Sequence, residues 1–130
     1  MKTFHLQIVT PRGEYFDGQA ERVILRTDNG DVAIMADHAN YVAVLDIGAA
    51  TVVTETGRRK AVCTGGMLVV TNGEARVIAT VFEWAEEVDK ERAKRALERA
   101  EARLADSSIS KERRVASERA KRRALLRLSM

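Results

Sequence analysis

Several residue types are scarce in this sequence, and each scarcity excludes a class of protein. The 130 residues include one cysteine, Cys63, one proline, Pro11, and only 5% aromatic residues. A single cysteine excludes a scaffold held by internal disulfides. Apolar runs such as residues 32–36 are too short to cross a bilayer, and His5 and Gln7 interrupt the stretch where a signal peptide would be apolar. We therefore expect a soluble protein of a reducing compartment.

Glycine and proline are absent from the last third of the chain. All 8 glycines and the proline lie at or before Gly73, and the sequence after Trp84 consists mainly of Ala, Glu, Lys, Arg and Leu. Such a change in composition indicates a domain boundary. We expect one domain at residues 1–84 and a second at residues 85–130.

The charge is divided between the same two parts. Residues 1–84 carry 8 basic and 10 acidic residues, whereas residues 85–130 carry 14 and 9. The excess is concentrated in residues 111–127, with 8 basic and 2 acidic residues. An acidic protein surface, a phosphate ligand or a nucleic acid would be attracted to that segment.

The first part has the pattern of an antiparallel β-sandwich. Phe4, Leu6 and Ile8 alternate with polar residues, and the pairs Asn29-Gly30 and Asn72-Gly73 are typical of tight hairpins. Short β-rich runs of this kind recur at close intervals, at residues 4–10, 23–25, 32–35, 41–45, 50–54, 61–64, 67–70 and 76–82. Such spacing predicts a sandwich or barrel of about ten short strands.

The second part has the pattern of a two-helix hairpin. Ala93, Leu97, Ala100 and Leu104 form one apolar stripe on a helix at residues 86–105. A serine-rich turn follows at residues 106–110, and a second helix is expected at residues 111–128. We expect the inward positions of the second helix to be Val115, Ala116, Ala120, Ala124, Leu125 and Leu128. Helices joined by so short a loop lie antiparallel. Their large apolar residues are few, so we expect a ligand, docking or a partner to hold them together.

Three motifs are better explained without a special site. Asp37, His38 and Cys63 fit no metal-ligand or nucleophile spacing, so we predict neither a metal site nor a catalytic residue there. Gly65-Gly66 lacks the Lys-Ser/Thr of a phosphate loop and is interpreted as a strand break. The basic C-terminal helix lacks the interleaved aromatic residues of a nucleic-acid-binding module.

Four arginines form a more specific constellation. Arg92 and Arg99 lie seven residues apart on the first helix, and Arg123 and Arg127 lie four apart on the second. An antiparallel hairpin would bring the two pairs together, with Asp89 at the start of the first helix. Spacing alone favours a solvated charged face with Asp89 as a helix cap; the alternative is a polyphosphate site, which suits the forked donors of arginine.

The whole chain resembles the epsilon subunit of bacterial rotary ATP synthases. The resemblance is carried by residues 4–13 (FHLQIVTPRG), 29–34 (NGDVAI), Asp37-His38 and 64–70 (TGGMLVV), by their order, and by the helical hairpin that follows. Ala33 and Ala36-Asp37 depart from the Gly and Pro-Gly that the family has at these positions.

The resemblance implies a non-catalytic rotor subunit that requires no cofactor. The sandwich would join the gamma subunit to the ring of membrane c subunits, and its c-ring contact would comprise Asp28, Asn29, Gly30, Asp31 and His38. In an extended state, the basic helix would meet the alpha and beta catalytic subunits and restrain ATP hydrolysis through Arg113, Arg114, Arg119, Arg122 and Arg123. The subunit would lie at the cytoplasmic face of the bacterial cell membrane, peripherally and only through the complex.

Some members of this family bind ATP on epsilon itself, through the motif Ile/Leu-Asp-x-x-Arg-Ala. Here the motif reads Val88-Asp89-Lys90-Glu91-Arg92-Ala93. By this resemblance the ATP-binding residues are Glu83, Asp89, Arg92, Ala93, Arg99, Arg123 and Arg127, and ATP is a regulatory ligand. The alternative function is a free-standing nucleotide-sensing or nucleic-acid-binding module that uses the basic helices.

Overall fold

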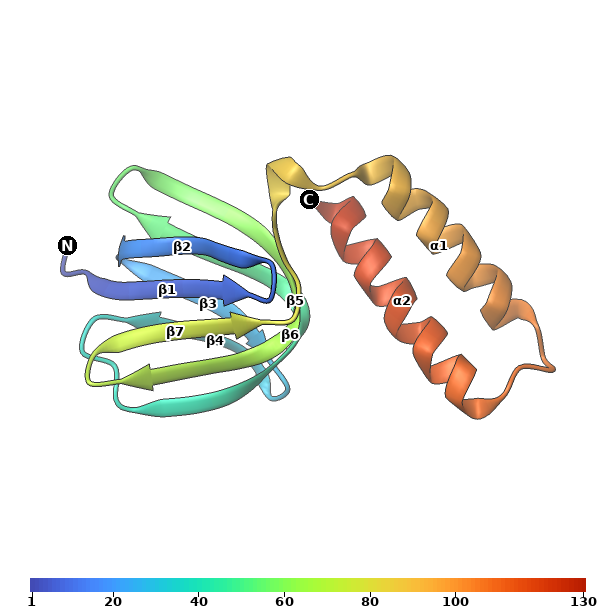
Figure 1. Cartoon of the computed structure of the whole chain (residues 1–130), viewed down its shortest axis with the longest axis horizontal. Helices are drawn as coiled ribbons and strands as arrows, with labels where there is room; N and C mark the ends of the chain where they lie inside the picture. The colour runs from blue at the N-terminus through green and yellow to red at the C-terminus, as the bar shows by residue number, and fades with distance from the viewer. The chain divides into compact units, whose positions relative to one another are not determined.

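The computed structural model describes residues 1–130, which divide into two compact units, Met1–Ala85 and Glu86–Met130 (Figure 1). The first unit contains β1 (Phe4–Thr10), β2 (Gly13–Ala20), β3 (Arg22–Thr27), β4 (Gly30–Met35), β5 (Tyr41–Thr54), β6 (Gly57–Thr71), β7 (Glu74–Ala79) and β8 (Phe82–Trp84). A 3-10 turn, η1 (Ala85–Glu87), precedes α1 (Lys90–Ala105) and α2 (Lys111–Ser129). Neither helix is both long and apolar enough to cross a membrane. The predicted fold class, a β-sandwich followed by a helical hairpin, is confirmed.

The strands form one continuous ladder in the order β2-β1-β7-β6-β5-β3-β4, with β8 on β6. All pairings are antiparallel except β1 with β7, where Leu6–Val9 run parallel to Ala75–Ile78. The predicted antiparallel β-sandwich is therefore confirmed, with one parallel pair that the sequence analysis did not anticipate. The reason is topological: β1 and β7 come from opposite ends of the domain, so no hairpin fixes their relative direction.

Two long strands, β5 and β6, fold this ladder into two layers. Each combines two of the eight short runs expected from the sequence, whereas the run expected at residues 76–82 is divided between β7 and β8. The interpretation of Gly65-Gly66 as a break was wrong, because β6 continues through both residues at positive φ. A Cβ on Gly66 would lie 2.1 Å from the carbonyl oxygen of Ile78. Glycine lets β6 bend there while it keeps its pairing with β7.

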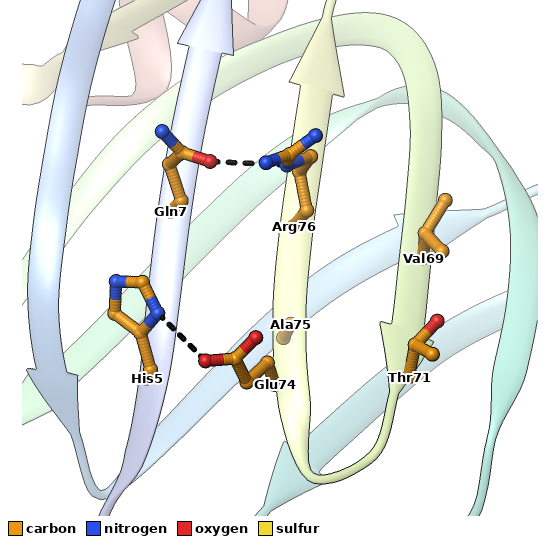
Figure 2. A pocket seen from close by; sticks show the side chains of 7 residues that line it. All are labelled: His5, Gln7, Val69, Thr71, Glu74, Ala75 and Arg76. Carbon is orange, nitrogen blue, oxygen red and sulfur yellow. Dashed lines mark hydrogen bonds and ion pairs between the residues drawn. The ribbon is translucent and has the colours of Figure 1, made fainter.

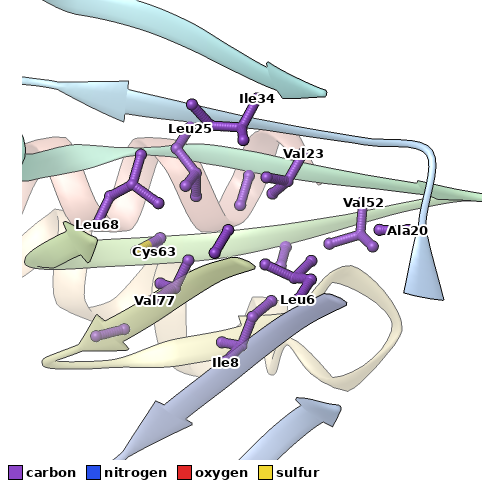
Figure 3. Packing of buried hydrophobic residues seen from close by; sticks show 14 of the residues in the cluster. Leu6, Ile8, Ala20, Val23, Leu25, Ile34, Val52, Cys63, Leu68 and Val77 are labelled. Atoms are coloured by element: carbon purple, nitrogen blue, oxygen red, sulfur yellow. The ribbon is translucent and has the colours of Figure 1, made fainter. Parts of the chain in front are cut away.

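The core lies between the two layers. Leu6 and Ile8 of β1 are fully buried against residues of the other layer such as Val23 and Leu25 of β3 and Ile34 of β4 (Figure 3). The predicted inward face of β1 is thus confirmed. The outward residues of the same strands remain available for binding.

One strand was not anticipated. β2 is an edge strand, polar and rich in exposed residues, and only Ala20 is buried. A strand with one protected edge and little burial lacks the apolar alternation that marks other strands. β2 is held in the sheet by its backbone hydrogen bonds with β1, which its own sequence pattern does not reveal.

The two helices pack antiparallel through small residues. Ala93 and Ala100 of α1 are buried with Ser117 and Ala124 of α2. The Lys90 ammonium donates to the Met130 carbonyl at 3.0 Å, so the start of α1 lies beside the end of α2. The stripe of α1 is confirmed, with Leu97 and Leu104 half-buried.

The inward face of α2 is only partly the expected one. Ala124 is buried and Ala120 and Leu128 are half-buried, as predicted, but Val115, Ala116 and Leu125 are exposed and the unpredicted Ser117 is 4% exposed. Close approach of two helices instead places the small side chains of Ser117, Ala120 and Ala124 at the contact, because larger ones would push the helices apart.

Candidate functional site

The hairpin gathers arginines on one of its two flanks. Arg92, Arg99 and Arg123 each come one position before a buried alanine, namely Ala93, Ala100 and Ala124. Because the helices run antiparallel, positions that precede the buried residues of both helices lie on the same flank of the pair. Arg127 follows Arg123 by one helical turn and extends the set. We call these four arginines the arginine flank.

Within this flank Arg123 lies in an electropositive surrounding. Its side chain is half-buried. Burial lowers the pKa of the Arg123 guanidinium from its ordinary value, and the positive charges of Arg127 and Arg119 lower it further. An anion at this position would relieve that repulsion, and a forked guanidinium can donate two hydrogen bonds to a phosphate.

Asp89 caps α1. Its carboxylate accepts a hydrogen bond from the Arg92 backbone amide at 3.0 Å, which satisfies one of the unpaired amides of the first turn. Ala93 is buried between the helices, so its role is to permit their approach. Glu83 belongs to β8 of the sandwich unit and is half-buried. Of the seven predicted ATP-binding residues, six thus lie in the hairpin unit and one in the sandwich unit.

The five arginines expected to contact catalytic subunits fall into two groups. Arg113, Arg119 and Arg122 are exposed, whereas Arg114 and Arg123 are half-buried. Arg114 is engaged within the hairpin, where its guanidinium donates to the carbonyl oxygens of Leu104 at 3.3 Å and Asp106 at 3.4 Å. The closed hairpin thus exposes the first group more than the second.

The five residues expected at the c ring do not form one cluster. Asp28, Asn29, Gly30 and Asp31 make the tip of the β3–β4 hairpin, where the Thr27 hydroxyl donates to the Gly30 carbonyl and accepts from the Asn29 amide. His38 lies beyond the other end of β4, about 20 Å away along that strand at ~3.3 Å per residue. Its ring nitrogen Nδ1 lies 2.7 Å from the Ala39 carbonyl oxygen.

The outer face of the β1, β7, β6 and β5 layer carries an apolar row that the sequence analysis did not identify. Val9, Ile78, Met67 and Val44 are cross-strand partners in succession. Ile78 is 46%, Met67 41% and Val44 53% exposed, and Val42 beside them is 61% exposed. We call these five residues the apolar row. Along each strand the exposed residues of the row alternate with residues that are more buried. They become neighbours of one another only because the strands pair.

The strands that carry the apolar row also carry outward polar residues of β1 and β7, which Figure 2 shows around a hollow. Arg76 of β7 donates to the Gln7 side chain at 3.0 Å, and His5 of β1 lies between Glu74 and Asp17. The contact with Asp17 raises the pKa of His5 above its ordinary value. A hollow of about 240 Å³ is lined by His5, Gln7, Val69, Thr71, Glu74, Ala75 and Arg76. The row thus has a charged border, as protein-binding surfaces commonly do.

Cys63 has the character of a core residue. It is 3% exposed, and burial raises its pKa to about 11. A thiol of that pKa is almost entirely protonated at neutral pH and reacts slowly. His38 belongs to the loop between β4 and β5 and packs against Tyr41, with ring centroids 5.7 Å apart.

Comparison with known proteins identifies the family. Residues 3–85 match the family model of the ATP synthase delta/epsilon chain, β-sandwich domain. The ATP synthase epsilon chain of Alkaliphilus oremlandii is 41% identical over 105 residues, which are 81% of this chain and 78% of that one. The epsilon chain of Caldanaerobacter subterraneus is 33% identical over 130 residues, 99% and 94% of the two chains, so that similarity includes the hairpin.

A similar fold occurs in a solved assembly. A chain in the mitochondrial ATP synthase OSCP/F1/c-ring structure of Euglena gracilis superimposes with a TM-score of 0.81 at 24% identity, covering 92% of this chain and 76% of that one. This likeness is one of fold, and the sequence matches carry the relationship. The chain belongs to the ATP synthase delta/epsilon family.

Proposed function

We propose that this chain is the rotor subunit that joins gamma to the c ring of a rotary ATP synthase, and that its hairpin restrains ATP hydrolysis. The observation that supports the rotor role is the apolar row. Exposed apolar residues that continue across the paired strands β7, β6 and β5, beside the half-buried Val9 of β1, mark a protein-binding surface. In a chain of this family, gamma is the partner that we assign to it.

The c ring is assigned to a different part of the sandwich. The tip of the β3–β4 hairpin presents the exposed carboxylates of Asp28 and Asp31 on a rigid turn. Arg26 lies 3.5 Å from Asp31 and partly balances its charge. We place the c-ring contact at this tip. His38, at the far end of β4, would then touch gamma or another part of the ring.

The hairpin is assigned the regulatory role. Its closed form would be held by ATP on the arginine flank, and release of α2 would bring Arg113, Arg119 and Arg122 to acidic segments of the alpha and beta subunits. The subunit itself would have no catalytic residue and require no cofactor. It would lie at the cytoplasmic face of the bacterial membrane through the complex. A free-standing or nucleic-acid-binding module is the less favoured alternative, because relatives that include the hairpin are epsilon chains.

Removal of the hairpin tests the assembly role. A chain that ends at Ala85 keeps all eight strands and the entire sandwich core. We expect it to fold and to co-elute with gamma in size-exclusion chromatography as the full chain does. Loss of the gamma complex in a truncated chain with a normal β-sheet circular dichroism spectrum would contradict the assignment of binding to the sandwich.

Neutralising the exposed basic face tests the inhibitory role. We expect the triple change Arg113→Gln, Arg119→Gln and Arg122→Gln to raise ATP hydrolysis by the assembled enzyme about twofold or more at low salt, where charge contacts are least screened. Glutamine preserves helix propensity. The control changes Arg58 and Lys60 of the sandwich to glutamine. An equal rise in the control, or no rise in the triple variant, would count against contact through these arginines.

A further inference from the structure

The last turn of α1 and the five residues that follow it hold two backbone groups, the Leu104 carbonyl and the Ser108 amide, that a continuous helix would pair with each other. In an unbroken helix the Ser108 amide would donate to the Leu104 carbonyl four residues earlier. Here the Ser108 amide donates to the Asp106 carboxylate at 2.9 Å, and the Leu104 carbonyl accepts from the Arg114 guanidinium at 3.3 Å. Two side chains have thus replaced one helical hydrogen bond.

Ser108 and Arg114 each make a second hydrogen bond that supports the first. The Ser108 hydroxyl also donates to the Asp106 carboxylate, at 2.6 Å, and the second arm of Arg114 donates to the Asp106 carbonyl at 3.4 Å. The hydrogen bonds from Ser108 lower the pKa of Asp106, with a smaller contribution from the charge of Arg114. Side chains that bond locally to the backbone in this way compete with helix formation.

The position of Arg114 is otherwise unfavourable. It lies in the first turns of α2, four residues after the Ser110 cap, where the helix dipole disfavours a cation. The same guanidinium lies at the carbonyl end of α1, where a cation is favoured and the last carbonyls lack partners. Arg114 therefore stabilises the chain through the end of α1 only while the two helices are separate and folded back on each other.

We propose that Asp106 and Arg114 form a lock that divides one potential helix into two and holds the hairpin closed. Opening the lock frees the Ser108 amide and the Leu104 carbonyl to pair, so the two helices can join into one extended helix. Arg114 is then a positioning residue of the closed form. Its effect on regulation rests on the proposed function, but the lock itself is a property of this chain alone.

The distance between the free ends of the helices reports the state of the lock. Glu91 and Ser129 are exposed and lie near the adjacent ends of α1 and α2. Packed helices have axes roughly 8–10 Å apart. One helix from residue 91 to residue 129 would separate the same residues by about 57 Å, at ~1.5 Å per residue. Spin labels on the full chain carrying Glu91→Cys and Ser129→Cys can therefore distinguish the forms, since buried Cys63 reacts slowly.

In pulsed electron resonance on the isolated chain, we expect Arg114→Gln to raise the long-distance fraction about tenfold, the effect expected for losing charged hydrogen bonds. Asp106→Ala combined with Arg114→Gln should raise it further. The matched control is Arg113→Gln, which removes the same charge from an exposed neighbour and should leave the wild-type distribution.

Arg114→Lys tests the forked shape of the guanidinium separately from its charge, because lysine keeps the positive charge but cannot span two carbonyl oxygens. We expect it to resemble Arg114→Gln more than wild type. Equal long-distance fractions in Arg114→Gln and Arg113→Gln, or a wild-type distribution in Arg114→Lys, would overturn the lock. The measurement uses the isolated chain without any partner subunit. Neither of these results would therefore follow from an error in the proposed function.

Discussion

Changing Met67 to glutamate should weaken the binding of this chain to gamma by about a hundredfold, which is the effect expected at the centre of a protein interface. Met67 lies between Ile78 and Val44 in the apolar row. Docking there would bury the new carboxylate among apolar groups without a partner, which is costly. In the free chain the side chain is 41% exposed, so glutamate can reach water and the sandwich should still fold.

Met35→Glu is the matched control. Met35 is also an exposed methionine on a strand, 52% exposed, but it lies on β4 at the other edge of the ladder. Binding can be measured by titration of purified gamma, and folding by circular dichroism. Unchanged affinity of Met67→Glu, or equal losses in both variants, would show that the row is not the gamma surface.

The second large effect concerns ATP. Arg123→Gln should reduce the affinity of the isolated chain for ATP at least tenfold, measured by titration calorimetry, because charged hydrogen bonds contribute roughly 1.5–3 kcal/mol. Arg123 is one of the two half-buried members of the arginine flank, with Arg127, and the positive charges of Arg119 and Arg127 repel its own. A ligand that binds only the closed hairpin stabilises it by about 2.7 kcal/mol at a hundredfold excess over its Kd.

Lys94→Gln is the control for charge. Lys94 follows Ala93 by one position, so it is exposed on the opposite flank of the helix pair and should not affect ATP binding. No heat of binding at millimolar ATP in the wild-type chain would leave the arginine flank as a solvated face. Equal weakening by Lys94→Gln would indicate a general charge effect.

Asp89 requires a different substitution. Alanine would remove the helix cap and cost about 1 kcal/mol of stability, whereas asparagine caps almost as well as aspartate. Asp89→Asn therefore tests the carboxylate alone. We expect weaker ATP binding with an unchanged melting temperature if this carboxylate orients an arginine or accepts a hydrogen bond from the ligand.

Features that depend on near neighbours could be predicted from the amino-acid sequence alone. The stripe with Ala93 and Ala100 and the cap at Asp89 each arise within a few residues of chain, and the structure has them where they were expected. The change in composition near Trp84 is equally local, and the two compact units of the structure meet at Ala85. Helical period and capping are local properties, so they can be predicted without knowledge of the fold.

Features that depend on distant partners could not be predicted in this way, because they arise only when the chain has folded. The apolar row exists because β1, β7, β6 and β5 lie side by side, and β2 is a strand because β1 pairs with it. Ser117 is buried because the close approach of α1 admits only small side chains. Arg114 finds its acceptors ten and eight residues earlier because the chain folds back. Each is a non-local contact, and the period of one segment does not specify which segment it will meet.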